Sequence, residues 1–408
     1  MREQPTPNLN DDRTRLGDRS RSISVALLRI GILVLAVALM RGWDRNDEFR
    51  GFSASYLVNY MFFLSISLGA LFFVVLQHLV RAGWSVTVRR LAEILAANVM
   101  YFAILFLPIV VPLLLGFSGP YYKWLDPQTA GDSELQAKSL YLNLPFFAAR
   151  AVLYLLVWGL LAWFFLRQST RQDESGDPGL TRRMEKAAPV AMILFGLTVT
   201  FASFDWLMSL EPAWSSTIFG LYYFAGSVVG ALAALILFAI ALQKGGAATR
   251  LITVEHYHEL GKLLLGFIVF WGYMAFSQYM LIWYANIPEE SVWYLARQTG
   301  PWKWITLGLL FGHLLIPFLL LLPREVKRRK ILLGVLAVWM LVVHWIDLYW
   351  LVIPTFAPEH LPFGVTDVCC IVALACLFLA GTIRTTRACN LIPLGDPRLG
   401  ESLAFENR

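Results

Sequence analysis

Charged residues are scarce in this chain of 408 residues, and their scarcity excludes an ordinary soluble protein. Asp, Glu, Lys and Arg together make up 15% of the sequence, whereas 58% is hydrophobic and 14% is aromatic. A soluble globular domain usually carries about 25% charged residues. The composition therefore predicts an integral membrane protein.

Cysteine is also scarce, and the spacing of the few cysteines lacks the common redox motifs. The four are Cys369, Cys370, Cys376 and Cys389, and neither C-x-x-C nor C-x-x-C-H occurs. Motifs of this kind hold iron–sulfur clusters and c-type haems. We therefore expect no redox cofactor bound by this chain, and we interpret the cysteines as small apolar side chains.

Long apolar runs are abundant, and ten of them are long enough to cross a bilayer. Crossing the hydrocarbon core takes about 20 residues at about 1.5 Å each. The runs do not alternate as the strands of a membrane barrel do, so the sequence predicts an all-α integral membrane fold with ten transmembrane helices. They cover residues 23–40, 55–79, 92–115, 144–166, 188–209, 216–242, 263–285, 302–322, 331–353 and 363–383.

The polar segments divide the chain into a ten-span membrane domain, residues 23–383, and two tails. Residues 1–22 are rich in Arg, Asp and Asn and predict a disordered cytoplasmic tail. Residues 384–408 form a second cytoplasmic tail. The polar crossings after the second and sixth runs are weakly similar, which suggests repeats at 55–209 and 216–353. Each repeat would then be a four-helix bundle, and the first and last helices would be peripheral.

The distribution of basic residues predicts the orientation in the membrane. Of the 34 Lys and Arg residues, 25 lie in the two tails and in the loops that follow the even-numbered spans. Another 7 lie in the loops that follow the odd-numbered spans. Basic residues are enriched on the cytoplasmic side, so both termini are expected there. The net charge of +6 then reflects topology and contact with lipid headgroups, and we expect no nucleic-acid partner.

Polar residues at membrane depth are informative because a charge there costs several kcal/mol and usually faces a partner or a cavity. They form an outer group, a cytoplasmic group and one histidine near the middle of its span. The outer group includes Arg150, Asp205, Gln278, His344 and Asp347, the cytoplasmic group includes Glu255, His256 and His258, and the isolated residue is His313.

His344 and Asp347 are three residues apart and share one helix face. A histidine beside a carboxylate is a plausible proton relay, because its pKa is easily moved across neutrality. The alternative is a structural pair, with Arg150 neutralising Asp347 or Asp205. A b-type haem between His313 and His344 is a further alternative, although the bulky neighbours of His344 do not favour it.

Two other positions also allow two interpretations. Asp205 lies about four residues, or roughly 6 Å, from the end of its span, so it is either a buried acid or a solvated one at the interface. The segment HYHELGK (256–262) is either a helix start with water-exposed histidines or a site of proton uptake from the cytoplasm.

Two blocks carry a family resemblance: FDWLMSLEPAWSSTIFGLYYFAG (204–226) and HYHELGKLLLGFIVFWGYMAFSQYMLIWYANIPEESVWY (256–294). They closely resemble the second large membrane subunit of bacterial alternative complex III, which belongs to the NrfD-like, polysulfide-reductase-like family. That complex is a quinol:cytochrome c oxidoreductase of the bacterial inner membrane. The resemblance implies two four-helix bundles plus two peripheral helices. It also implies three kinds of partner: an NrfD-like quinol subunit, an iron–sulfur subunit and c-type cytochrome subunits that hold the haems and clusters.

One departure from the family pattern concerns quinol. In the related quinol-oxidising subunit a histidine follows the tryptophan after the turn, whereas Ser215 follows Trp214 here. Subunits of this family are often described as quinone-binding, so the resemblance keeps a quinol site open as an alternative. Its expected lining is Arg150, Asp205, Trp214 and Gln278.

The sequence therefore favours a scaffolding and proton-conducting subunit of a quinol oxidoreductase complex. The alternatives are a subunit with its own quinol site and a stand-alone secondary transporter. The outer loops 116–143 and 286–301 are expected to bind extrinsic redox subunits. The hypothetical proton path comprises Glu255, His256 and His258, then His313, and then His344, Asp347, Asp205 and Glu211.

Overall fold

The computed structural model describes residues 14–43, 50–115, 122–126 and 131–407, and its regular elements in these ranges are helices. Ten of the helices are long and apolar enough to cross a membrane, which confirms the predicted fold class. Most continue past the predicted boundaries, because polar residues at a helix end extend the helix beyond its apolar part. The ten cover Arg19–Gly42, Gly51–Leu79, Val86–Leu114, Leu144–Ser175, Pro178–Leu210, Phe219–Lys244, Val254–Ala285, Trp302–Leu321, Lys330–Thr355 and Val365–Ala388.

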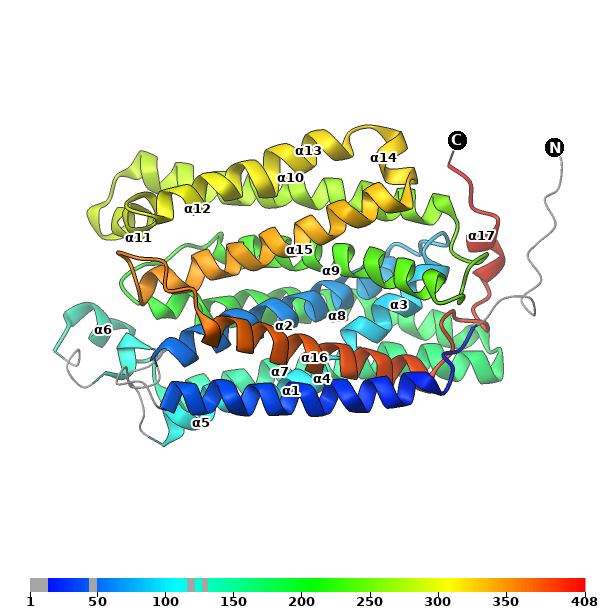
Figure 1. Cartoon of the computed structure of the whole chain (residues 1–408), viewed down its shortest axis with the longest axis horizontal. Coiled ribbons are helices and arrows are strands. Elements are labelled where there is room, and N and C mark those ends of the chain that lie inside the picture. The colour runs from blue at the N-terminus through cyan, green and yellow to red at the C-terminus, as the bar shows by residue number, and fades with distance from the viewer. Residues whose placement is uncertain (1–13, 44–49, 116–121, 127–130, 408) are drawn as a thin grey trace.

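The second to fifth spans pack against one another as a first bundle (Figure 1). The third span of the chain, which is the second crossing of this bundle, is interrupted twice, so that three short helices follow one another. The bundle consists of α2 (Arg50–Leu79), the consecutive helices α3 (Val86–Ala96), α4 (Val99–Leu105) and α5 (Leu107–Leu114), then α7 (Leu144–Ser175) and α8 (Pro178–Trp206).

The sixth to ninth spans form a second bundle, and α2 packs against its first helix, α9, at the centre of the molecule. Both central helices are apolar on all sides, as expected for helices buried on every face. The second bundle consists of α9 (Phe219–Lys244), α10 (Val254–Ala285), the continuous run α12 (Trp302–Leu309), η5 (Leu310–Leu315) and α13 (Ile316–Leu321), and α15 (Lys330–Val352).

The first and last spans, α1 (Arg19–Trp43) and α16 (Val365–Ala388), pair with each other and flank α2 (Figure 1). The two helices approach closely at Gly31, where a Cβ atom would come within 3.0 Å of the Ala373 carbonyl oxygen. The Ser24 hydroxyl donates to the Ala380 carbonyl at 2.9 Å. These are the two predicted peripheral helices.

Both ends of the described chain lie at the same end of the molecule, where the Leu391 amide donates to the Thr14 carbonyl at 2.8 Å (Figure 1). This end is called the terminal end, and it also carries α14 (Arg324–Arg328) and α17 (Leu399–Leu403). The opposite, distal end carries α6 (Ser133–Lys138) and α11 (Pro288–Gln298).

The predicted tails differ from the structure at their boundaries. Helix α1 begins at Arg19, inside the predicted tail 1–22, of which residues 1–13 lie outside the described residues. Helix α16 continues to Ala388, past the predicted start of the second tail at 384. The following segment is packed onto the helices, and Leu391 and Ile392 are fully buried there.

The η5 segment is a π-helical turn that carries His313. The Ile316 amide bonds to the Phe311 carbonyl five residues back, and Pro317 has no amide hydrogen with which to continue the pattern. The free carbonyl of Gly312 accepts a hydrogen bond from Trp339 Nε1 on α15 at 2.8 Å. Such π-turns interrupt α-helices mostly at functional sites.

Candidate functional site

Asp347 lies on α15, in the interior of the second bundle and only 2% exposed. Its Oδ1 accepts a hydrogen bond from Tyr222 Oη on α9, and its Oδ2 accepts one from Trp271 Nε1 on α10 at 3.2 Å. Both donors are neutral. Among the described residues Asp347 has no ion-pair partner, so its carboxyl group is held in the protein interior by neutral donors.

His344 lies one turn before Asp347 and is held by the central helices. Its Nε2 lies 2.8 Å from Ser65 Oγ on α2, so this contact joins the two bundles. The ring packs against Gly226 and Gly230 on α9, where a Cβ atom would come within 3.0 and 2.8 Å of it. Its Nδ1 is buried and has no hydrogen-bond partner among the described residues.

His313 lies beside this pair, and its ring centroid is 6.3 Å from that of His344. Its ring is fully buried, and the ring of Trp271 lies 3.7 Å away between centroids. Neither of its ring nitrogens has a hydrogen-bond partner in the described part of the chain. The structure thus brings together His313, His344 and Asp347, which we call the acid–histidine cluster.

This geometry does not favour a haem between the two histidines. Nε2 of His344 is directed to Ser65 on α2, and Trp271 covers the ring of His313. Within the described residues, moreover, no group of three or more His, Cys, Asp or Glu side chains is arranged to hold a metal ion.

Arg150 and Asp205 form a separate, fully paired site in the first bundle. Arg150 Nε donates to Asp205 Oδ2 at 2.7 Å and Nη2 donates to Oδ1 at 2.9 Å. Tyr154 Oη also donates to Oδ2 at 2.8 Å. Asp205 is completely buried, so the interpretation as a solvated interfacial acid is wrong. Of the two structural pairings considered from the sequence, Arg150 neutralises Asp205.

The aromatic side chain of Tyr141 covers the outer face of this ion pair. The guanidinium carbon of Arg150 lies 3.9 Å from the centroid of the Tyr141 ring. Tyr141 lies in the turn before α7, outside the membrane-spanning segments, and burial raises the pKa of its phenol, with the Asp205 carboxylate acting in the same direction. Its hydroxyl therefore stays protonated beside the carboxylate.

The four residues expected to line a quinol site lie in different places. Trp214 stacks on Trp293, with ring centroids 4.3 Å apart, and borders a groove of about 610 Å³. Gln278 accepts from Ser216 Oγ and donates to Tyr294 Oη, both at 3.1 Å, beside a smaller groove of about 240 Å³. Arg150 and Asp205 line neither groove.

Ser215 and Glu211 occupy the turn at the distal end. Ser215 is exposed and borders both grooves, so the serine at the departure from the family pattern faces open space. Glu211 is bound by Lys123 Nζ at 2.7 Å. Glu211 is therefore an interfacial ion-pair partner, distant in the fold from the acids and histidines of the terminal end.

The residues predicted at the cytoplasmic side lie beneath the C-terminal segment, residues 389–407, which follows α16. His256 is fully buried: its Nδ1 accepts from the Thr253 amide at 3.0 Å, and its Nε2 lies 3.2 Å from Ser402 Oγ. His258 is 7% exposed, and its Nδ1 lies 3.1 Å from Asn407 Nδ2. The interpretation of these histidines as water-exposed is therefore wrong, because residues from the end of the chain cover them.

Glu255 lies beside these histidines and pairs with α14. Arg328 Nη1 donates to its Oε2 at 2.8 Å, and Arg328 Nη2 lies 2.5 Å from its Oε1. No hydrogen bond among the described residues links Glu255, His256 or His258 to His313. The hypothetical path is thus divided: Glu255, His256 and His258 lie at the terminal end, whereas the acid–histidine cluster lies in the interior of the second bundle.

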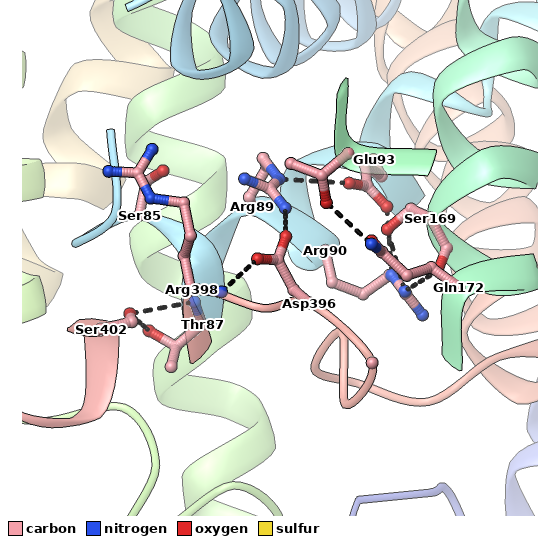
Figure 2. A network of polar contacts seen from close by, with 12 residues as sticks. Ser85, Thr87, Arg89, Arg90, Glu93, Ser169, Gln172, Asp396, Arg398 and Ser402 are labelled. Atoms are coloured by element: carbon pink, nitrogen blue, oxygen red, sulfur yellow. Dashed lines mark hydrogen bonds and ion pairs between the residues drawn. The ribbon is translucent and has the colours of Figure 1, made fainter. Parts of the chain in front are cut away.

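A second buried network at the terminal end was not predicted (Figure 2). Arg90 on α3 is fully buried and uses all of its donors. Nε bonds to Glu93 at 3.0 Å, Nη1 bonds to Asp173 at 2.8 Å and to the Asn390 carbonyl at 3.1 Å, and Nη2 bonds to the carbonyl and hydroxyl of Ser169 at 3.0 and 2.9 Å. Such complete satisfaction is typical of a structural arginine.

The C-terminal segment completes this network. Asp396 pairs with Arg89, and Ser402 lies 3.2 Å from Thr87 Oγ1 and donates to the Trp84 carbonyl at 2.6 Å (Figure 2). Because Ser402 also contacts His256 on α10, the segment joins the terminal ends of both bundles. No local pattern in the sequence indicates these contacts, since the partners are about 150 to 315 positions apart.

The fold and the site define a ten-span helical membrane protein with a buried acid–histidine cluster in its second bundle. Comparison of the chain with models of protein families and with curated proteins found no match.

Proposed function

We propose that this chain is a membrane subunit of a quinol:electron-acceptor oxidoreductase complex, in which it supports its partners and provides a half-channel for protons that contains Asp347. The sequence blocks at 204–226 and 256–294 support the class of complex. The carrying observation is the acid–histidine cluster, in which a buried carboxyl group with neutral hydrogen-bond donors and two buried imidazoles lie together.

The contrast between two buried acids supports a proton-handling role for this cluster. Asp205 is held by a bidentate arginine, so a cation neutralises its charge. Asp347 is held only by Tyr222 and Trp271. A buried carboxylate with neutral neighbours is costly, and taking up a proton relieves this cost. Asp347 is therefore the carboxyl group suited to exchanging a proton.

The unpartnered ring nitrogens and the position of Asp347 on α15 define the proposed half-channel. His344 Nδ1 and both nitrogens of His313 are buried without protein partners among the described residues, and bridging waters can connect such groups. Asp347 lies five residues before Val352, where α15 ends toward the distal end, and this corresponds to about 8 Å along the helix. The short route from the cluster therefore leads to the distal end.

The remaining parts of the proposal follow from the charge distribution and from the resemblance. The chain lies in the bacterial inner membrane, with the terminal end in the cytoplasm. Haems and iron–sulfur clusters are held by partner subunits, which bind at the distal end through the loops 116–143 and 286–301; part of the first loop lies outside the described residues. Arg150, which is committed to Asp205, does not contribute a quinol site in this proposal.

The substitution Asp347→Asn tests the proposal because it keeps the shape of the side chain and removes the titratable group. In the purified complex reconstituted into vesicles, we expect normal subunit content and a loss of at least half of the proton movement per quinol oxidised, measured with a pH-sensitive dye. The matched control is Asp367→Asn, which alters a buried acid that caps the start of α16 by accepting from the Gly364 amide at 2.8 Å. It should leave proton movement unchanged.

Two results contradict the proposal in different ways. Normal proton movement in an assembled Asp347→Asn complex would show that the acid–histidine cluster has a structural role only. Purification of the chain from its native membrane without any haem-bearing partner would remove the assignment to a redox complex and favour the transporter alternative.

A further inference from the structure

A long groove of about 590 Å³ runs between α1, α4 and α16, on the outer face of the peripheral pair. Along α1 its lining extends from Arg21 to Leu35, which corresponds to about 21 Å at about 1.5 Å per residue. One leaflet contributes half of a hydrocarbon core about 30 Å thick, and headgroups add a further layer. The groove therefore matches the depth of one lipid leaflet.

The two ends of this groove differ in chemistry. Toward the terminal end it is bordered by Arg21, Arg384 and Arg387, all three exposed. None of these guanidinium groups has a hydrogen bond or an ion pair within the described part of the chain. Toward the middle of the membrane the lining is apolar and includes Ile32 and Leu105.

The floor of the groove is fixed by polar contacts within the protein. Asn98, at the break between α3 and α4, donates from Nδ2 to Thr382 Oγ1 on α16 at 2.8 Å. At the neighbouring Gly381 a Cβ atom would collide with Asn98 Oδ1, so the absence of a side chain allows this close contact. The groove is therefore a preformed feature of the helix packing.

We propose that this groove binds one anionic phospholipid from the leaflet at the terminal end. Its phosphate lies among Arg21, Arg384 and Arg387, because guanidinium groups bind phosphate oxygens through paired hydrogen bonds. Its acyl chain lies against the apolar part of α1, α4 and α16. A neutral quinone would fill the apolar part but would leave the three cations without a partner.

The first test measures lipid retention by the whole protein. The chain is reconstituted into nanodiscs of phosphatidylcholine with increasing phosphatidylglycerol, and bound lipids are counted by native mass spectrometry after release. We expect one retained phosphatidylglycerol per chain. The combined change Arg21→Gln, Arg384→Gln and Arg387→Gln should weaken this retention about tenfold or more, since each basic residue adds to the attraction for anionic lipid.

The matched control removes the same charge from another part of the terminal end. Arg171, Arg182 and Arg183 are exposed and do not border the groove. Changing these three to Gln should leave retention of phosphatidylglycerol within about twofold of the unmodified protein, because only charge at the groove is relevant.

A second pair of variants tests the acyl-chain part of the groove. Ile32 borders the groove, whereas Ile30 is also exposed to the membrane but lies outside it. Ile32→Trp should reduce retention several-fold by filling the groove, and Ile30→Trp should not. Both substitutions exchange one apolar, lipid-facing side chain for another, so both proteins should fold.

Several outcomes would overturn the proposal. Equal retention of phosphatidylcholine and phosphatidylglycerol would exclude selection by charge. Unchanged phosphatidylglycerol in the groove variant with three glutamines, or equal effects of Ile32→Trp and Ile30→Trp, would place the lipid elsewhere. Retention of added ubiquinone in place of phosphatidylglycerol, or occupation of the groove by a helix of a partner protein in the assembled complex, would identify a different occupant.

Discussion

The imidazole of His344 lies against the backbone of Gly230: a Cβ atom at this glycine would come within 2.8 Å of His344 Cδ2. The absence of a side chain at Gly230 therefore sets the position of the histidine. It also preserves the contact between His344 Nε2 and Ser65 Oγ, 2.8 Å long, that links the second bundle to the first.

Gly230→Ala is expected to displace the His344 ring and break its contact with Ser65. Overpacking in a filled interior costs about 1–3 kcal/mol, so the free energy of unfolding in mixed micelles should fall by that amount. Gly266→Ala, on α10, is the matched control because nothing lies within 4 Å of its Cβ position. The interpretation fails if both alanine variants lose the same stability.

Arg150→Met is expected to destabilise the protein by about 3–5 kcal/mol, because it leaves the buried carboxylate of Asp205 without its cation. The double variant Arg150→Met and Asp205→Leu removes both charges and should recover most of that loss. Unfolding free energies of the two single variants and the double variant form a complete cycle. Additive losses would show that the ion pair at 2.7 Å is not energetically coupled.

Lys327 provides a prediction about pH at the terminal end. Its Nζ donates to the carbonyls of Leu321, Leu322 and Pro323 at 2.5, 3.0 and 3.2 Å. It lies on α14, outside the membrane-spanning helices, and burial lowers the pKa of its ammonium group below the ordinary value of 10.5, with the nearby charge of Lys262 acting in the same direction.

The direction in which stability changes with pH follows from how many protons Lys327 binds in the folded and unfolded states. Between the lowered pKa of Lys327 and 10.5 the unfolded chain binds more protons than the folded chain, so this group makes stability rise with pH in that window. Lys327→Met should therefore lose stability relative to the unmodified protein as pH increases toward 10.5, measured by denaturant midpoints. The exposed Lys186 is the control, and Lys186→Met should show no such change with pH.

The existence and order of the ten helices could be predicted because each apolar run has the length of a bilayer crossing. Their ends could not be predicted to the same accuracy. Helix α10 begins at Val254 and α8 at Pro178, whereas the apolar runs begin at 263 and 188. Hydropathy detects only residues that contact lipid or the core, and both helices continue as polar helix outside that region.

The candidate site was predicted only in part. Asp347, His344 and His313 are evident from the sequence, because ionisable residues in an apolar run are conspicuous. Tyr222 and Trp271 are not, since aromatic residues are common throughout these runs and only the rotation of α9 and α10 directs these two to the acid.

The exposure of the terminal-end histidines was predicted wrongly for a related reason. A polar helix start next to charged residues is usually wet. His256 is covered by Ser402, which is 146 positions away, and the sequence near His256 contains no sign of this contact. Packing by a segment so distant in the chain follows from the three-dimensional arrangement.

The pairing of α1 with α16 has a consequence for biosynthesis. The main partner of α1 is α16, with eight candidate spans between them along the chain. Long-range contacts of this kind form late, because the intervening chain must be ordered first. During translation α1 is therefore surrounded by lipid at first. Its surface at Gly31 contacts Leu377 and Ala373 only after α16 has been inserted. A chain synthesised only as far as α15 can insert most of the described helices and still lack both this helix pair and the segment that joins the bundles. The molecule therefore gains these contacts only after α16 and the residues that follow it have been made.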